Sequence, residues 1–227
     1  MEGIRLLQEA LASGLTVEPI LYAPERLATT AAGRALRQRL EHLPAAEQID
    51  EHVLAATAET VTSQGVVAAV RVPPSRPLPA EGHVLVLDGI ADPGNAGSML
   101  RTARAAGAAA VVTTRATADL WSPKTVRAGM GAHFHLNLHL DVDWADLPAL
   151  LGDRAILLAA AHQGMSYWEV DWRQPAAIVI GSEAHGASPA ADNLATQRVC
   201  IAMAEGAESL NAAAAAAVLL FASRRRA

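Results

Sequence analysis

The feature that most constrains the fold is a regular alternation of short apolar runs and helical stretches from residue 83 onward. The apolar runs have the length of buried strands and cover 83–88, 109–114, 134–140, 155–161, 177–182 and 198–203. The helical stretches cover 97–106, 123–130, 144–151, 189–195 and 208–225. Buried strands that alternate with helices are typical of an α/β fold, so we predict a mostly parallel sheet with helices on both faces.

A proline-rich segment, VPPSRPLPAEG at 72–82, predicts a linker between two domains. The stretch before it, 1–71, predicts a small α/β domain. Its expected elements are a helix over 4–14, a strand over 17–22, a basic helix over 31–40 and a strand over 65–72. The stretch after it, 83–227, forms the larger domain.

Composition limits the class of protein. The chain has one cysteine, Cys200, which excludes an internal disulfide and is typical of the reducing cytoplasm. The net charge of −5 counts mildly against nucleic-acid binding, but all basic residues except Lys124 are arginines, the side chain better suited to phosphate contacts. The longest apolar run, 210–222, is too short to span a bilayer. We therefore expect a cytoplasmic protein with room for a local basic patch.

Ligands of parallel α/β sheets bind beyond the carboxyl ends of the strands. The first loop there, DPGNAG, has two glycines that allow a tight turn, with Asn95 between them. It lacks the G-x-G-x-x-G spacing and the lysine of phosphate-binding loops, so an enzyme of the dinucleotide class is disfavoured. Arg101 and Arg104 follow in the expected helix, where they either face an anion near the helix start or point into solvent.

Two further loops reach the same edge of the predicted sheet. In IVIGSEAHGAS, Glu183 and His185 offer a pair for acid–base work, or Glu183 shapes the loop by accepting backbone amides. In IAMAEGAESLN, Glu208-Ser209 predicts a helix start, with Ser209 or Asn211 as its cap. Six alanines follow, and a bare alanine face buries little area. We therefore expect another backbone to pass close to this helix, or a tight subunit interface.

Taken in order, DPGNAGSMLRTARAAGA, IVIGSEAHGAS and IAMAEGAESLNAAAAAAVLLF resemble the three motifs of the SpoU/TrmH-type RNA 2′-O-ribose methyltransferases of the SPOUT superfamily. The resemblance covers 83–226. Within 1–71, EGIRLLQEALASG and TSQGVVAAV resemble the RNA substrate-binding domain of rRNA-directed members, without the basic helix and first strand that usually precede them. The resemblance implies a ribose methyltransferase directed to rRNA rather than tRNA.

The resemblance also implies a trefoil knot in the C-terminal third and a homodimer formed through the knot and the last helix. It implies that S-adenosylmethionine binds in the knot, held mainly by backbone groups, and that no metal is needed. The cofactor-binding residues that it implies are Ala160, Gly181, Ile201, Met203, Ser209 and Leu210.

The catalytic residues implied by the resemblance are Asn95, Arg101, Glu183, Ser209 and Asn211. The family assigns to the arginine the activation of the 2′-hydroxyl. A guanidinium is essentially never deprotonated in proteins, so we interpret Arg101 as a clamp that grips the adjacent phosphate and stabilises the developing alkoxide. A base role for the same residue is the alternative.

The second motif departs from the family pattern N-E-G-x-G at Ser182, Ala184 and His185. These departures predict a different loop shape or substrate preference. The competing functions are a non-catalytic RNA-binding relative of the same fold and a tRNA-directed enzyme. Retention of the catalytic set argues against the first.

Two remaining groups have simpler interpretations. His133, His135 and His139 are expected on one strand, and no cysteine or carboxylate at ligand spacing supports a zinc site on them. Trp168 and Trp172 are expected to cover a core edge or an oligomer interface rather than to stack on RNA bases. The terminal arginines, 224–226, either touch RNA phosphate or complement the last helical turn.

Overall fold

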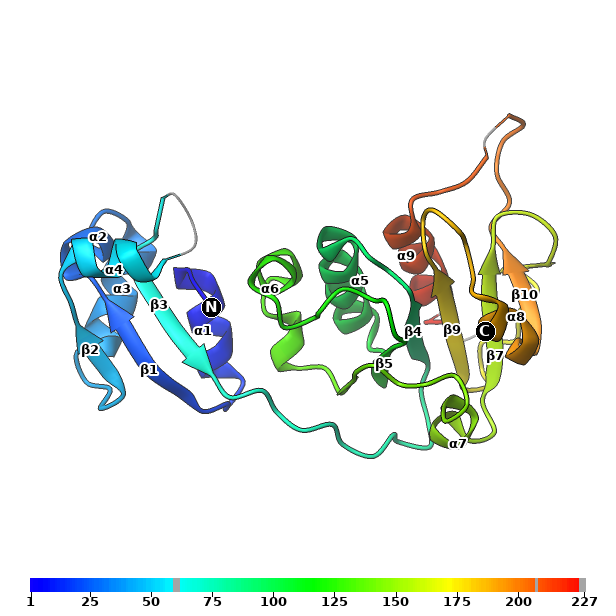
Figure 1. Ribbon diagram of the computed structural model, residues 1–227, viewed down its shortest axis with the longest axis horizontal. Helices are drawn as coiled ribbons and strands as arrows, with labels where there is room; N and C mark the ends of the chain where they lie inside the picture. Colours follow the sequence, from blue (N-terminus) through cyan, green and yellow to red (C-terminus); the bar gives the residue numbers. More distant parts are fainter. Residues whose placement is uncertain (59–61, 207, 225–227) are drawn as a thin grey trace. The chain divides into compact units, whose positions relative to one another are not determined.

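The computed structural model describes residues 1–58, 62–206 and 208–224 (Figure 1). The chain forms two compact units, Met1–Pro73 and Pro74–Ala227. Residues 71–79 contain no helix or strand, as expected of a linker. The side chain of Asn137 accepts a hydrogen bond from the Arg76 amide at 2.8 Å and donates one to the Arg76 carbonyl at 2.8 Å. The second half of the linker therefore packs on the larger unit.

The N-terminal unit is a three-stranded sheet with four helices among its described residues. Its elements are α1 (Ile4–Ala12), β1 (Val17–Tyr22), α2 (Pro24–Leu27), α3 (Ala31–Leu40), β2 (Ala46–Gln48), α4 (Glu51–Thr57) and β3 (Val66–Val70). The strand order is β2-β1-β3, with β1 parallel to β2 and antiparallel to β3. The expected elements are all present. The short α2, β2 and α4 lacked a long enough pattern to be predicted.

The larger unit is built on a seven-stranded sheet in the order β6-β5-β4-β9-β7-β10-β8, in which every pairing is parallel. Its strands are β4 (Val84–Asp88), β5 (Ala110–Thr113), β6 (Leu138–His139), β7 (Ala155–Ala160), β8 (Met165–Ser166), β9 (Ala176–Gly181) and β10 (Gln197–Cys200). Its helices are α5 (Pro93–Ala106), α6 (Pro123–Gly129), η1 (Ala132–Phe134), α7 (Leu147–Leu151), α8 (Pro189–Leu194) and α9 (Ala212–Ala222). The predicted fold class is confirmed at this level.

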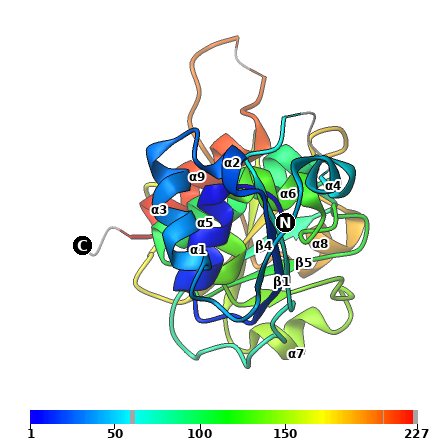
Figure 2. The same cartoon turned by 90° about the vertical axis from the view of Figure 1, so that its left-hand side faces the viewer.

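Side chains of β4 alternate between two layers of helices because successive residues of a strand point to opposite faces. Leu85 and Leu87 pack with buried residues of α5 and α9, whereas Val84 and Val86 pack with buried residues of α7 and α8. Figure 2 shows α8 on the opposite side of β4 from α5 and α9. The sheet is thus covered on both faces, and its loops are left at the two ends of the strands.

The predicted strand over 134–140 is present only at its C-terminal part, as β6 (Leu138–His139). After α6 the backbone turns through left-handed conformations at Met130 (φ 49°) and Gly131 (φ 82°), which end the helix and start η1. The ring of His133 packs in η1 against the Gly129 backbone, and only His139 lies in a strand. The three histidines therefore do not share one strand. No group of three metal-ligating side chains occurs among the described residues.

The last helix begins at Ala212, later than the predicted start at Glu208. Asn211 is its cap, because its side-chain oxygen accepts hydrogen bonds from the amides of Ala213 and Ala214 at 2.9 and 3.3 Å. Capping by Asn211 leaves Ser209 and Leu210 outside the helix. Among the alanines, Ala216 is completely buried where α9 packs on α5 and β9.

The predictions for the two tryptophans and for the terminal arginines have different outcomes. Trp172 covers a core edge as expected, and its indole donates to the Tyr167 carbonyl at 3.0 Å. Trp168 is 61% exposed. Arg224 donates to the Ala105 carbonyl at the end of α5 at 3.2 Å, while residues 225 and 226 lie outside the described part of the chain. No described helix is long and apolar enough to cross a membrane.

Candidate functional site

A cavity of about 280 Å³ lies beyond the carboxyl ends of three adjacent strands, β9, β7 and β10. Its lining consists of Ala159, Ala160, Ala161, Ile180, Gly181, Ser182, Glu183, Gly186, Ala187, Val199, Ile201, Met203, Ser209, Leu210, Ala212, Ala215 and Leu219. This position agrees with the general location of ligand sites in parallel sheets. All six residues predicted to bind a cofactor contribute to the lining, although their binding role stays a prediction.

Among the described residues that line this cavity, Glu183 is the one that carries a charge. The other lining residues are apolar or small, and much of the polarity therefore comes from backbone amides and carbonyls. Such a cavity suits a flat, uncharged ring that is recognised by backbone donors and acceptors.

Close packing of backbone shapes the mouth of the cavity. The amides and carbonyls of Ser182 and Gly186 pair with each other at 2.8 and 2.9 Å, which folds the loop after β9 back on itself. A side chain on Gly181 would meet the backbone of Gly186 and Ala187 at 2.4–2.5 Å. Gly186 has a φ of +69°, which favours glycine. This loop therefore requires glycine at both positions.

A chain of hydrogen bonds joins the three sequence motifs at the edge of the cavity. The Asn95 amide nitrogen donates to Glu183 Oε1 at 2.5 Å, and the Asn95 amide oxygen accepts from Asn211 Nδ2 at 3.1 Å. Asp92 caps α5 by accepting from the Asn95 backbone amide at 2.7 Å. The structure thus brings together Asn95, Glu183 and Asn211, which are far apart in the sequence.

The other two predicted catalytic residues lie differently. Ser209 lines the same cavity as Glu183. Arg101 lies on α5, is exposed, and is absent from the cavity lining. Its guanidinium has no hydrogen bond or ion pair within the described residues. The structure therefore leaves Arg101 available to a partner, outside the hydrogen-bonded chain.

Sequence reasoning missed Asp88, a buried carboxylate at the end of β4 that accepts hydrogen bonds from three different segments. Its position at the carboxyl end of an apolar strand was the available signal. It also missed Ala212, Ala215 and Leu219, which line the cavity from α9.

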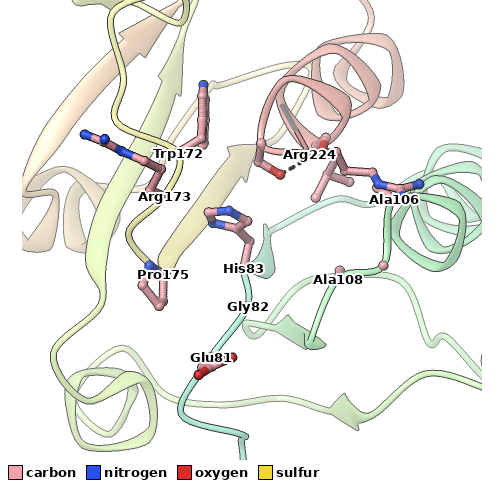
Figure 3. A pocket seen from close by; sticks show the side chains of 12 residues that line it. Glu81, Gly82, His83, Ala106, Ala108, Trp172, Arg173, Pro175 and Arg224 are labelled. Atoms are coloured by element: carbon pink, nitrogen blue, oxygen red, sulfur yellow. Dashed lines mark hydrogen bonds between the residues drawn. The ribbon is translucent and has the colours of Figure 1, made fainter. Parts of the chain in front are cut away.

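A larger cavity, of about 1240 Å³, lies at the opposite end of β4 (Figure 3). His83, Trp172, Arg173 and Arg224 contribute to its lining. Burial lowers the pKa of His83, and its Nδ1 accepts from the Ala176 amide at 3.3 Å. None of the predicted site residues lies there, so size alone does not identify the functional cavity.

A parallel α/β sheet with a backbone-lined cavity and a polar cluster at the carboxyl ends of its strands is typical of ligand-binding domains of the α/β class. The family model described as the SpoU rRNA Methylase family matches residues 82–221, and a model described as the MRM3-like substrate binding domain matches residues 1–68. The chain belongs to the SpoU rRNA methylase family and is an RNA methyltransferase by this membership. The predicted resemblance is confirmed.

Individual relatives agree with the family. The chain is 32% identical to the 23S rRNA (guanosine(2553)-2′-O)-methyltransferase RlmP of Bacillus subtilis, over 97% of this chain and 86% of that protein. It is 30% identical to rRNA methyltransferase 3A, mitochondrial, of Danio rerio. That match covers 100% of this chain but only 63% of the relative, which is longer. The crystal structure of the SpoU methyltransferase AviRb from Streptomyces viridochromogenes, in complex with AdoMet, matches with a TM-score of 0.85 and 28% identity, over 99% of this chain and 88% of that one.

Proposed function

We propose that the protein transfers a methyl group from S-adenosylmethionine to a ribose 2′-hydroxyl in ribosomal RNA. The observation that carries the proposal is the hydrogen-bonded chain of Asn95, Glu183 and Asn211 beside a backbone-lined cavity. The relative from Bacillus subtilis is named as a 2′-O-methyltransferase of 23S rRNA, which supports the reaction and the RNA class. The match of residues 1–68 to a substrate-binding domain supports an RNA-binding role for the N-terminal unit.

The residues of the cavity fit S-adenosylmethionine. Ile180, Leu210 and Leu219 offer apolar surface for the adenine ring, and the backbone at Gly181, Ile201 and Met203 offers donors and acceptors for its edge. The AdoMet complex of the structurally similar AviRb supports the same cofactor. When bound, the cofactor supplies an electrophilic methyl group on a sulfonium.

The protein's own groups position the acceptor. Asn95 is held through both atoms of its amide, so that its orientation is determined before RNA binds. Arg101 is free to grip an RNA phosphate and to stabilise the alkoxide that develops on the 2′-oxygen. Because a guanidinium keeps its protons, the hydroxyl proton leaves to phosphate or water.

We also propose the trefoil knot and the homodimer that the family implies. A side chain on Gly164 would meet the Arg198 carbonyl at 2.7 Å, so backbone from two separate segments lies in close contact here, which supports the knot. Phe221 is 49% exposed on α9, the helix that would form the dimer interface. An exposed aromatic ring on such a helix suits a contact with a second copy.

The proposal is tested by isothermal titration with S-adenosylmethionine, followed by transfer of labelled methyl to ribosomal RNA and mapping of ribose methylation. We expect saturable cofactor binding and one methylated ribose in rRNA. RNA binding without cofactor binding would identify the non-catalytic relative, and methylation of tRNA alone would identify the tRNA-directed enzyme. Either result would overturn the proposal.

The Gly181→Ala variant is expected to bind S-adenosylmethionine at least about tenfold more weakly, because the added methyl displaces the backbone of Gly186 and Ala187 that shapes the cavity. Isothermal titration measures the change. Gly107→Ala is the matched control. Gly107 caps α5 with a φ of 72°, away from the cavity, so its replacement should lower stability without changing cofactor affinity. Equal affinity in wild type and Gly181→Ala would contradict the cavity assignment.

A further inference from the structure

Asp88 is the buried carboxylate at the end of β4, with 4% of its surface exposed. It forms no ion pair among the described residues. Its Oδ1 accepts from Thr114 Oγ1 at 3.0 Å and from the Trp144 indole at 3.2 Å, and its Oδ2 accepts from the Ser188 backbone amide at 2.7 Å. Three donors replace the water that a buried carboxylate loses, which makes each of these hydrogen bonds costly to remove.

The loop that carries Glu183 is held at both ends by this one residue. At its start, Gly181 is the neighbour of Asp88 in the register of β4 and β9. At its end, the Ser188 amide donates to the Asp88 side chain. Between these two points the pairing of Ser182 with Gly186 closes the loop into a hairpin.

Glu183 lies in this hairpin and accepts the hydrogen bond of the Asn95 side chain. The position of the Glu183 carboxylate therefore depends on the two ends of the loop, and the orientation of the Asn95 amide depends on Glu183. A purely structural role, in which Asp88 only satisfies donors in the core, would affect stability alone.

We propose that Asp88 is a positioning residue of the methyl-transfer site: by anchoring the loop 182–187 it sets the place of Glu183 and, through it, of Asn95. The inference rests on the proposed function, because it assigns the held Asn95 amide a role in the reaction. Asp88 itself does not touch the cavity and is not a catalytic residue.

The first test compares Asp88→Ala with Asp88→Asn and Trp144→Phe. Asp88→Ala removes both acceptors and should lower kcat for methyl transfer to rRNA about a hundredfold, as small displacements in an active site do. Asp88→Asn keeps one oxygen for the Ser188 amide and should recover at least about a tenth of the wild-type kcat. Trp144→Phe removes one donor from the same carboxylate but leaves the loop contact, so its kcat should stay within about twofold of wild type.

A readout independent of activity is the side-chain amide resonance of Asn95 in ¹⁵N-labelled full-length protein. We expect Asp88→Ala to move this resonance toward its position in Glu183→Gln, and Trp144→Phe to leave it unchanged. An unmoved resonance in folded Asp88→Ala would overturn the inference, even if the RNA target differs from the one proposed. If the wild-type protein transferred no methyl group to RNA, that result would instead reject the proposed function.

A second pair of variants avoids the carboxylate, in case Asp88→Ala does not fold. Ser188 has φ −68° and ψ 156°, values that proline adopts, so Ser188→Pro deletes the amide hydrogen with little backbone strain. Ser188→Ala removes only the side chain that caps α8 and keeps the amide. We expect kcat of Ser188→Pro to be at least about tenfold below that of Ser188→Ala. Equal values would overturn the inference.

Discussion

The Arg101→Ala variant is expected to lose about 100- to 1000-fold in kcat, while its Kd for S-adenosylmethionine stays within about twofold of wild type. Arg101 is exposed on α5, has no partner in the described part of the chain, and does not line the cavity proposed for the cofactor. Its removal therefore takes away charge stabilisation at the acceptor and leaves the cofactor contacts in place. Single-turnover methyl transfer and isothermal titration measure the two effects separately.

Two further variants sharpen this prediction. Arg101→Lys keeps the charge but loses the planar pair of donors, so it should recover only part of the rate. Arg104 lies about one turn further along the same helix, so the kcat of Arg104→Ala should fall much less than that of Arg101→Ala. A parallel loss of cofactor affinity and turnover in Arg101→Ala would mean that the residue supports the fold or the cofactor instead.

Acidification is expected to destabilise the larger unit through His133, by up to about 3 kcal/mol between pH 6.5 and pH 4. His133 is completely buried, and neither ring nitrogen has a partner at good hydrogen-bond geometry among the described residues. Burial lowers the pKa of His133 from its usual value near 6.5 to about 4. The folded state therefore disfavours the proton, and the stability present above pH 6.5 is lost as the pH falls toward 4.

Denaturant unfolding at several pH values measures this effect. The four tryptophans, Trp121, Trp144, Trp168 and Trp172, all lie in the larger unit, so their fluorescence reports on it alone. The His133→Leu variant should lose stability with acid less steeply than wild type, because the apolar side chain binds no proton. His162 is exposed, and His162→Leu should keep the wild-type dependence. If the free energy of unfolding of His133→Leu fell with pH as steeply as that of wild type, the acid sensitivity would come from other groups. His83 and His139 are such groups, because burial also lowers their pKa values.

The positions of the three loops along the chain could be predicted from the sequence, because each loop begins where an apolar, strand-like run stops. The partnership of their side chains did not follow. Asn95 and Asn211 are 116 positions apart, and only the folding of α5 against α9 brings their amides together. The same holds for Asp88 and the Ser188 amide, which are 100 positions apart.

Local periodicity failed where a turn overrode it. The apolar and histidine-rich run at 134–140 has the composition of a strand, yet after the left-handed turn at Met130 and Gly131 its first residue belongs to the short 3₁₀ helix η1, and only Leu138–His139 lies in a strand. Likewise, Glu208-Ser209 has the composition of a helix start, but Asn211 caps α9, so both residues precede the helix and Ser209 lines the cavity.

The sequence by itself determined the α/β class, the carboxyl-end location of the candidate site and the family, because strand and helix periods and ordered motifs are local properties of a chain. Tertiary structure alone decided which polar groups meet: the hydrogen bonds from Asn95 to Glu183 and Asn211, the anchoring of their loop by Asp88, and the burial of His133. Such contacts depend on strand order and loop closure, which bring together residues that are distant along the chain.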